Sequence, residues 1–225
     1  MSGWRCPGRR LISHWEVPVY ARSSTIVARL SAIDAGTTYL HEVVMPNLSE
    51  MQGWVGLSLL VDRALRRCVA TTAWESEAAM QDSRPQVKPL RDGLALAFEG
   101  RLEVIEEWDV PVMHRDRAAG DGASTRCTWM QGNPGDIGRE IETFRTGVLP
   151  ALQTMDGFCS ASLFVNRTTG RAVGVTAWAD LRSLEGSRAQ IDQIRSTLTR
   201  RAGVSVQEVT EFELILAHLR VPEMA

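Results

Sequence analysis

Histidine and cysteine are the residues of this sequence that could act as metal ligands or nucleophiles, and neither type is clustered. The cysteines and histidines are Cys6, Cys68, Cys127 and Cys159, and His14, His41, His114 and His218. A zinc site needs several such ligands close together, and the sequence has no Cys-x-x-Cys or His-Glu-x-x-His motif. It also has no glycine-rich dinucleotide loop, phosphate loop or serine elbow. We therefore expect reduced thiols, no metal and no cofactor; a flavin held non-covalently in a pocket stays open as an alternative.

The composition is that of a folded globule without a dominant charge. Of 225 residues 44% are apolar, and 25 basic side chains stand against 27 acidic ones, for a formal net charge of −2. No global field attracts nucleic acid or anionic lipid, and no apolar run approaches the ~18 residues of a membrane span. We expect a cytoplasmic protein with no nucleic-acid and no membrane partner. Lys88 is the only lysine, which indicates a GC-rich coding sequence of the kind typical of actinobacteria.

The chain contains an internal repeat. A shift of 104 positions places residues 44–108 on residues 148–212 in one gap-free register. The matches include Pro46 with Pro150, Gly53 with Gly157, Thr72-Ala73-Trp74 with Thr176-Ala177-Trp178, Ser83-Arg84 with Ser187-Arg188, and Glu107 with Glu211. Two copies of a module of roughly 100 residues explain a register of this length. We predict a loose N-terminal extension over 1–20, a first module over 21–110, a linker over 111–123 and a second module over 124–225.

Each copy alternates between β-rich runs and helical segments. In the first copy the predicted strands cover 24–32, 54–62, 67–74 and 101–110, and a helix N-capped by Asp34 covers 36–48. The second helix follows an N-cap at Ser76, where Pro85 and Pro89 make it short or irregular; in the second copy it runs unbroken from Asp180 to Gly203. The order β-α-β-β-α-β is that of ferredoxin-like folds, with helices on one face of an antiparallel sheet. Because the other face is apolar too, we predict an α+β fold in which the two sheets pack face to face as an intrachain α/β barrel.

The segment that follows the third strand carries a recognisable motif. It reads Thr72-Ala73-Trp74-Glu75-Ser76-Glu77-Ala78-Ala79, and the pairs Gly53-Trp54 and Gly157-Phe158 begin the two hairpins. With these features the chain, from about residue 22 and twice over, resembles the antibiotic-biosynthesis-monooxygenase superfamily of dimeric α+β barrels. The second copy departs from the motif, because Trp178-Ala179-Asp180-Leu181 lacks the glutamates. Most members build the barrel from two chains, so the resemblance implies a monomer that is a fused pseudo-dimer, with further homodimer formation left open.

The resemblance implies a pocket between sheet and helices where a small aromatic phenol or quinol is oxidised without a cofactor. An electron-rich phenolate can pass an electron directly to O2, so the pocket needs apolar walls and polar groups that hold the oxyanion. On this reading Trp74 is a catalytic wall residue. The implied substrate-binding residues are Trp178 as a second wall, Thr72 and Thr176 as hydrogen-bond donors, and Arg84 and Arg188 as holders of an anionic oxygen. Each has a structural alternative: core packing for the tryptophans, solvated surface for the arginines, and ordinary strand positions for the threonines.

His41 is the remaining catalytic candidate. Heme-degrading relatives place an iron-ligating histidine nine or ten residues after the strand-ending tryptophan, where this chain has Ser83-Arg84 and Ser187-Arg188, so heme breakdown is disfavoured. His41 is expected on the pocket side of the helix over 36–48, where it would suit a phenol as a general base at neutral pH. The alternative is a surface position. We therefore expect the first module's pocket to be the active one.

Two functions of different classes fit the sequence. The first is a cofactor-independent monooxygenase that acts on an aromatic phenol or quinol, favoured by the Trp74-to-Ala78 motif. The second is a non-catalytic α/β barrel that binds an apolar ligand or a protein partner, favoured because no convincing acid–base pair accompanies the motif. The fold alone does not separate them, because one fold hosts many activities.

Overall fold

The two modules close into one eight-stranded barrel. The computed structural model describes residues 19–219, and the strands follow the order β1-β3-β2-β8-β5-β7-β6-β4 around the barrel, each antiparallel to its neighbours. The strands are β1 (Val19–Val27), β2 (Trp54–Asp62), β3 (Arg67–Trp74), β4 (Arg101–Arg115), β5 (Ser124–Gln131), β6 (Phe158–Asn166), β7 (Arg171–Trp178) and β8 (Ser205–Leu219). The predicted α+β fold of two fused ferredoxin-like modules is confirmed.

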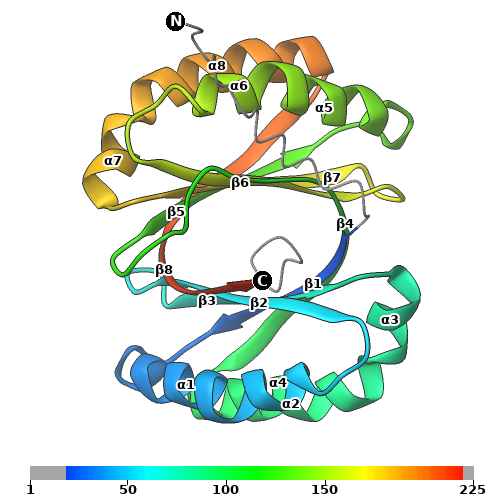
Figure 1. Cartoon of the computed structure of the whole chain (residues 1–225), viewed down its shortest axis with the longest axis vertical. Coiled ribbons are helices and arrows are strands. Elements are labelled where there is room, and N and C mark those ends of the chain that lie inside the picture. The colour runs from blue at the N-terminus through cyan, green and yellow to red at the C-terminus, as the bar shows by residue number, and fades with distance from the viewer. Residues whose placement is uncertain (1–18, 220–225) are drawn as a thin grey trace, which may run out of the picture.

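The helices lie outside the barrel in two layers, one for each module (Figure 1). Those of the first module are α1 (Ile33–Tyr39), α2 (Met45–Ser49), α3 (Glu77–Asp82) and α4 (Arg84–Ala97), with the short turns η1 (Leu30–Ala32) and η2 (Leu40–Val44). Those of the second are α5 (Ile137–Thr143), α6 (Leu149–Leu152), α7 (Leu181–Gly186) and α8 (Arg188–Ala202), with η3 (Pro134–Asp136) and η4 (Phe144–Val148). The chain thus stacks as helices, sheet, barrel interior, sheet and helices.

The longest strands, β4 and β8, join the two modules. Each has 15 residues. The first part of β4 pairs with β1, and its last part, from Asp109 to Arg115, pairs with β6 of the other module. Strand β8 pairs in the same way, first with β5 and then with β2. Strand β4 therefore runs through the predicted module boundary at residue 110, and residues 111–115 of the predicted linker belong to it. Of the predicted N-terminal extension, residues 1–18 lie outside the described residues, and the last two begin β1.

The first helical segment begins earlier than the sequence pattern predicts. Strand β1 covers Val19–Val27 and the helical turn η1 starts at Leu30, so the bounds 24–32 predicted for this strand are wrong. Asp34 lies inside α1 and does not cap it. In both modules a π-helical turn precedes the short helix that carries Pro46 or Pro150. Proline has no N–H to bond the carbonyl four residues back, and a wider turn accommodates it.

The second helix of each module begins at the predicted cap. The Ser76 hydroxyl accepts a hydrogen bond from the Ala79 N–H at 3.1 Å, and the Asp180 carboxylate accepts one from the Ser183 N–H at 2.7 Å. Gly203 ends α8 in the left-handed conformation with a φ of 72°. All three predicted helix ends are confirmed.

Both copies of this helix are broken at the same place, which the sequence pattern did not predict for the second copy. The break separates α3 from α4 at Ser83 and α7 from α8 at Ser187. Proline is not its common cause, because the second copy has none there and Pro89 lies inside α4. At the break each serine hydroxyl donates a 2.7 Å hydrogen bond to a carbonyl three residues earlier.

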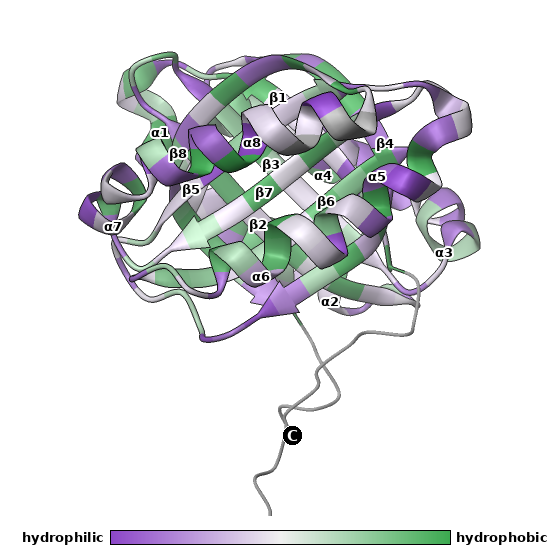
Figure 2. Cartoon of the chain, turned by 90° about the horizontal axis from the view of Figure 1, so that it is seen from above, coloured by the Kyte–Doolittle hydropathy of each residue, from purple (hydrophilic) through white to green (hydrophobic). Residues whose placement is uncertain are grey.

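Apolar side chains form three layers of core. One lies between sheet and helices in each module, and the third lines the barrel interior. Hydrophobic residues recur along the strands and the helices, as the green segments of Figure 2 show. Trp108 and Phe212 are 104 positions apart, each is 4% exposed, and both belong to the interior layer. The described cysteines are buried and unpaired, in agreement with reduced thiols. Burial raises the pKa of the Cys68 thiol to about 12, so it is neutral at physiological pH. Cys6 lies outside the described residues.

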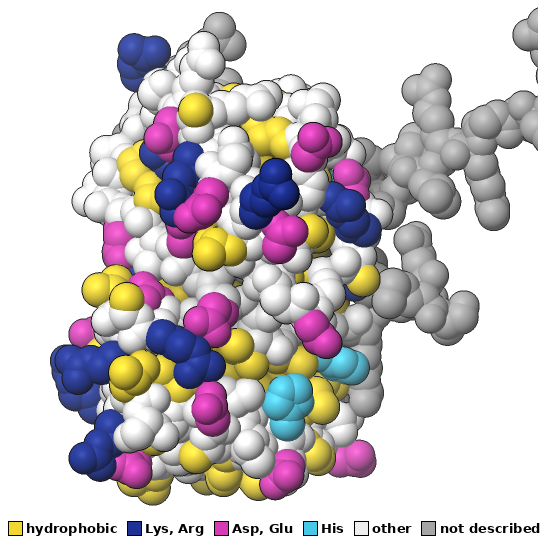
Figure 3. Space-filling model, turned by 90° about the vertical axis from the view of Figure 1, so that its left-hand side faces the viewer, with side chains coloured by type: hydrophobic (Ala, Val, Ile, Leu, Met, Phe, Trp, Pro, Cys, Tyr) yellow, Lys and Arg dark blue, Asp and Glu magenta, His cyan; other side chains and the backbone are white. Residues whose placement is uncertain are grey.

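The surface carries charges of both signs. On the face shown in Figure 3, arginine and acidic side chains are interspersed with small apolar patches. Within residues 19–219, no helix combines the length and apolar character that crossing a bilayer requires.

Gly36 shows how tightly the first module's helices pack on its sheet. A Cβ atom at Gly36 would lie 2.1 Å from the ring of Phe98, which is fully buried. We expect Gly36→Ala to lower the free energy of unfolding by about 1–3 kcal/mol, the typical cost of overpacking a core. Urea denaturation checks this. Gly138→Ala, in α5, is the matched control, because a Cβ there meets nothing within 4 Å. It should be neutral or stabilising by up to about 1 kcal/mol, and equal effects of the two changes would contradict the packing argument.

Candidate functional site

The predicted tryptophans and threonines lie together as neighbours in the core. Trp74 is fully buried, and its Nε1 donates to the Thr72 hydroxyl at 3.1 Å. The Thr72 hydroxyl donates in turn to the Arg22 carbonyl on β1 at 3.3 Å. In the second module Trp178 donates to Thr176 at 3.1 Å and Thr176 to the Arg126 carbonyl at 3.4 Å. The expectation that each pair shares a strand face is confirmed, and the hydroxyls are already engaged by the protein.

Arg22, which the sequence analysis did not single out, is the centre of this polar chain. It is 3% exposed, and its guanidinium forms an ion pair with Glu107 on β4 at 2.8 Å. It also donates to the Ser83 hydroxyl at 3.3 Å and to the Met80 carbonyl at 2.7 Å, which lie at the break between α3 and α4. Arg84, predicted to hold a substrate oxygen, is exposed and pairs with the same Glu107 carboxylate at 2.8 Å. The network fastens the helix break to the sheet.

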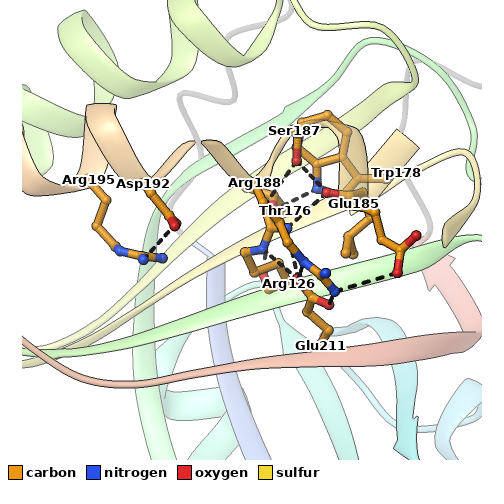
Figure 4. A network of polar contacts seen from close by, with 10 residues as sticks. Arg126, Thr176, Trp178, Glu185, Ser187, Arg188, Asp192, Arg195 and Glu211 are labelled. Atoms are coloured by element: carbon orange, nitrogen blue, oxygen red, sulfur yellow. Dashed lines mark hydrogen bonds and ion pairs between the residues drawn. The ribbon is translucent and has the colours of Figure 1, made fainter. Parts of the chain in front are cut away.

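The second module repeats this network (Figure 4). Arg126 is 3% exposed and pairs with Glu211 at 2.8 Å. Its guanidinium donates to the Ser187 hydroxyl at 3.0 Å and to the Leu184 carbonyl at 2.9 Å. Arg188, the other predicted oxyanion holder, is bound to Glu211 at 2.5 Å. Extending the repeat toward the N-terminus would have found both central arginines, because Arg126 is 104 positions after Arg22.

The two carboxylates at the centre of these networks are held ionised. Burial acts to raise the pKa of Glu107, but hydrogen bonds from Arg84, Arg22 and Gln81 outweigh it and keep the pKa below its usual range. Glu211 behaves in the same way through Arg188 and Arg126. A carboxylate with a lowered pKa stabilises the fold above its unfolded pKa, and this stabilisation is lost as the pH falls through the folded value.

A cavity of about 110 Å³ lies between the sheet and the helices of the second module. We call it the second-module cavity. Its apolar lining consists of Met130, Phe144, Val148, Leu152, Leu163, Ala172, Gly174, Ile191, Ile194 and Val204. The π turn η4 and helix α8 form its outer wall. Its polar lining is Arg126, Thr128, Glu140, Thr143, Thr176, Arg195 and Thr199, and this described lining includes no histidine or cysteine.

Glu140 is the unusual group in this cavity. The residue is 8% exposed, and its Oε1 is buried without a hydrogen-bond partner among the described residues. The carboxylate lies against Gly132, where a Cβ atom would be 1.9 Å from Oε1. Burial raises the pKa of Glu140, the Asp136 carboxylate raises it further, and the Arg139 charge opposes them. A buried, unpaired carboxylate with a raised pKa is typical of a general acid or base.

Arg195 supplies a donor to the same cavity. Its Nη2 is bound to Asp192 at 2.7 Å, whereas its Nη1 is buried and has no hydrogen-bond partner among the described residues. Glu140 and Arg195 both line the cavity, and each has a buried polar atom without a hydrogen-bond partner among the described residues: an acceptor on Glu140 and a donor on Arg195. This pair complements a hydroxyl that gives up a proton and becomes an oxyanion.

The equivalent space of the first module is filled. In the internal repeat, Gly36 is the residue equivalent to Glu140, and the Phe98 ring lies against this glycine. The residue at the position of Phe98 in the second copy is an alanine, and Gly174 replaces Ala70. We therefore place the candidate pocket in the second module and not, as expected, in the first, because Phe98 occupies the corresponding space there.

His41 does not lie on the pocket side of its helix. It belongs to the π turn η2 and its side chain is exposed. The predicted general base in the first module is therefore corrected to a surface position. Trp74 and Trp178 are both fully buried and line neither the second-module cavity nor the barrel interior. Glu140, which was not predicted from the sequence, stands out where the two copies differ, because it aligns with a glycine, Gly36, in the internal repeat.

Comparison with known proteins gives close sequence relatives and distant structural ones. No protein-family model matches the chain. It is 46% identical to the uncharacterized protein Rv2557 of Mycobacterium tuberculosis (strain ATCC 25618 / H37Rv) over 206 residues, 92% of each chain. It is also 46% identical to Rv2558 of the same strain, over 92% of this chain and 87% of that one.

Solved structures share the fold at low sequence identity. The putative monooxygenase FN1347 of Fusobacterium nucleatum superposes with a TM-score of 0.67 at 14% identity, over 92% of this chain and 96% of that one. An anthrone oxidase-like protein superposes with a TM-score of 0.65 at 12% identity, over 91% and 94%. A ferredoxin-fold protein of Listeria monocytogenes related to antibiotic biosynthesis monooxygenases reaches 0.50 at 10% identity, over 86% and 94%. At these identities the likeness establishes the fold alone.

We expect Arg22→Met to lower the free energy of unfolding by about 3 kcal/mol, because it removes the buried partner of Glu107 and the donor to the helix break. Arg84→Met is the matched control. It removes an exposed arginine from the same carboxylate and should cost much less, because solvent screens an exposed ion pair. Urea denaturation at pH 7 measures both, and equal costs would show that Arg22 is not the centre of the network.

Glu140→Gln should stabilise the fold by about 1 kcal/mol at pH 7, since it removes a charge that burial disfavours. A raised folded pKa makes the ionised carboxylate destabilising, so the gain should shrink as the pH falls. It should vanish below about pH 4, where the carboxyl is protonated in both states. Thermal unfolding from pH 4 to 8 measures this. The exposed Glu142→Gln on the same helix should change little, and a destabilised Glu140→Gln at neutral pH would contradict the argument.

Proposed function

Because the chain belongs to the family of the Mycobacterium tuberculosis proteins Rv2557 and Rv2558 and has the barrel fold of antibiotic-biosynthesis monooxygenases, we propose that it oxidises a single-ring phenol or quinol with O2. The reaction takes place in the second-module cavity. The observation that carries the proposal is the buried Glu140 carboxylate, whose Oε1 has no hydrogen-bond partner among the described residues. A phenolic hydroxyl supplies the donor that this oxygen lacks.

The polar groups of the cavity fit the proton transfer that starts the reaction. Glu140 accepts the phenolic proton, and its raised pKa brings it closer to neutral pH, where a general base is most effective. The unpaired Nη1 of Arg195 donates to the phenolate oxygen that results. The apolar lining excludes water, so the phenolate stays poorly solvated and electron-rich.

The oxidation balances with O2 as the only other reactant. The phenolate gives one electron to O2, and the radical pair combines at the ring carbon opposite the oxygen to form a hydroperoxide. Loss of water from the hydroperoxide gives a para-quinone. In total, one phenol with a free para C–H and one O2 give one quinone and one water, and O2 accepts four electrons. A para-quinol, whose para carbon already carries a hydroxyl, forms no ring hydroperoxide; one quinol and one O2 give one quinone and one H2O2, and O2 accepts two electrons.

The size of the cavity limits the substrate. A cavity of roughly 150 Å³ in an apolar core holds benzene, and the second-module cavity measures about 110 Å³. The second-module cavity is the smaller of the two, so it admits one ring at most and no fused polycycle. The fold is shared with an anthrone oxidase-like protein, and the volume argues for a smaller substrate here.

The test is oxygen uptake with a panel of single-ring phenols and hydroquinones, with ligand binding measured in parallel by calorimetry. We expect turnover by the wild type and a loss of kcat of about 10²–10⁴-fold in Glu140→Gln, the range of general base catalysis. The value of kcat/KM should rise with pH through the raised pKa of Glu140, because the ionised form is the base. Glu142→Gln should behave as the wild type.

Gly174→Leu tests the location. A Cβ atom at Gly174 meets only Phe144 and Met130, at 3.6 and 3.7 Å, so a larger side chain is directed into the cavity. This variant should lose both turnover and binding. A wild type that binds phenols but consumes no oxygen would instead favour the non-catalytic barrel, and equal turnover in Gly174→Leu would place the reaction elsewhere.

A further inference from the structure

The barrel interior contains a second cavity, separated from the second-module cavity by the sheet. Its volume is about 310 Å³, and strands of both modules line it. We call it the lumen cavity. The two cavities share no lining residue, because alternate residues of one strand face opposite sides of the sheet. In β6, for example, Leu163 lines the second-module cavity, whereas Ser162 and Phe164 line the lumen cavity.

The inner part of the lumen cavity is apolar with a few hydroxyl groups. Leu60, Val110, Phe164 and Leu214 belong to its walls. Thr125 is 1% exposed, and its hydroxyl is buried without a hydrogen-bond partner among the described residues. The first copy has an alanine at the equivalent position, so the hydroxyl is not needed for the fold. An unpaired buried hydroxyl is costly unless a ligand engages it.

We take the end of the lumen cavity at which β4 and β8 finish as its opening, and basic side chains lie there. His114 and His218 line it, and they are 104 positions apart. His114 stacks on Phe158 with ring centroids 6.4 Å apart, and His218 stacks on Trp54 at 5.6 Å. Arg115 lines the same opening and, among the described residues, has no ion-pair partner.

The balance of charge at this opening favours an anion. The carboxylate that lies nearby, Asp116, is bound to the His114 ring at 2.7 Å. This leaves the guanidinium of Arg115 uncompensated among the described residues. A cation at the rim of an apolar cavity recognises a ligand that has an anionic head and an apolar body.

We propose that the lumen cavity is a second ligand site, which takes an aromatic carboxylate whose apolar body is about two fused rings in size. The volume is about twice the roughly 150 Å³ that holds one benzene ring. The carboxylate binds Arg115 and the adjacent imidazoles, and the rings lie between the two sheets. This site is independent of oxidation in the second-module cavity.

The experiment uses 2-naphthoate as probe and 2-naphthylmethanol as its neutral analogue, with calorimetry and the fluorescence of the tryptophans as readouts. Wild type should bind 2-naphthoate more tightly than the alcohol. Arg115→Gln should weaken 2-naphthoate about tenfold and leave the alcohol unchanged. Arg101→Gln is the matched control, an exposed arginine at the other end of β4, and should change neither.

Filling variants locate the site. Ser162→Leu should abolish 2-naphthoate binding and leave single-ring phenols bound, whereas Gly174→Leu should do the reverse. Unchanged 2-naphthoate binding in Ser162→Leu, or equal affinity of Arg115→Gln and wild type for 2-naphthoate, would overturn the proposal. Should Ser162→Leu fail to fold, the Arg115→Gln comparison still decides, because that change lies at the rim.

Discussion

The buried arginine at the junction of strand and helix is the constraint around which each module is built. Arg22 and Arg126 are almost wholly removed from water, so each needs partners for its guanidinium N–H groups. A glutamate on the neighbouring strand supplies the countercharge, and the helix break supplies a hydroxyl and a carbonyl. The break is therefore not a defect of the helix: an unbroken helix would have no free carbonyl to offer there. The tryptophan and threonine of the motif join the same arrangement through the arginine's own carbonyl.

Fusion of the two modules has allowed them to diverge. In a barrel of two identical chains each change occurs twice, once in each half. Here the first module has filled its space between sheet and helices with Phe98, whereas the second has kept a cavity there and placed Glu140 in it. The filled half contributes packing, and the open half carries the cost of a buried carboxylate. On the proposed function, stability and chemistry are assigned to different halves of one chain.

The sequence predicted the fold better than the site, for physical reasons. The 104-residue register and the order of strands and helices defined two modules, because core faces and helix caps such as Ser76 and Asp180 are local signals. The long-range pairs were missed: Arg22 is unremarkable until its partner Glu107, 85 positions away, is beside it. The predicted oxyanion holders were surface arginines of the same network. Glu140 was not predicted because the internal repeat reveals what the two copies share, and this glutamate is present in only one of them.

The two long strands have a consequence for how the protein unfolds. Strands β4 and β8 each begin in one sheet and end beside the other, so neither sheet can separate without exposing hydrogen-bonding groups of its partner. A half expressed alone would present two bare β-edges, which are templates for association with another chain. We expect the two halves to unfold as one cooperative unit, so that a destabilising substitution in the first module also lowers the stability of the second.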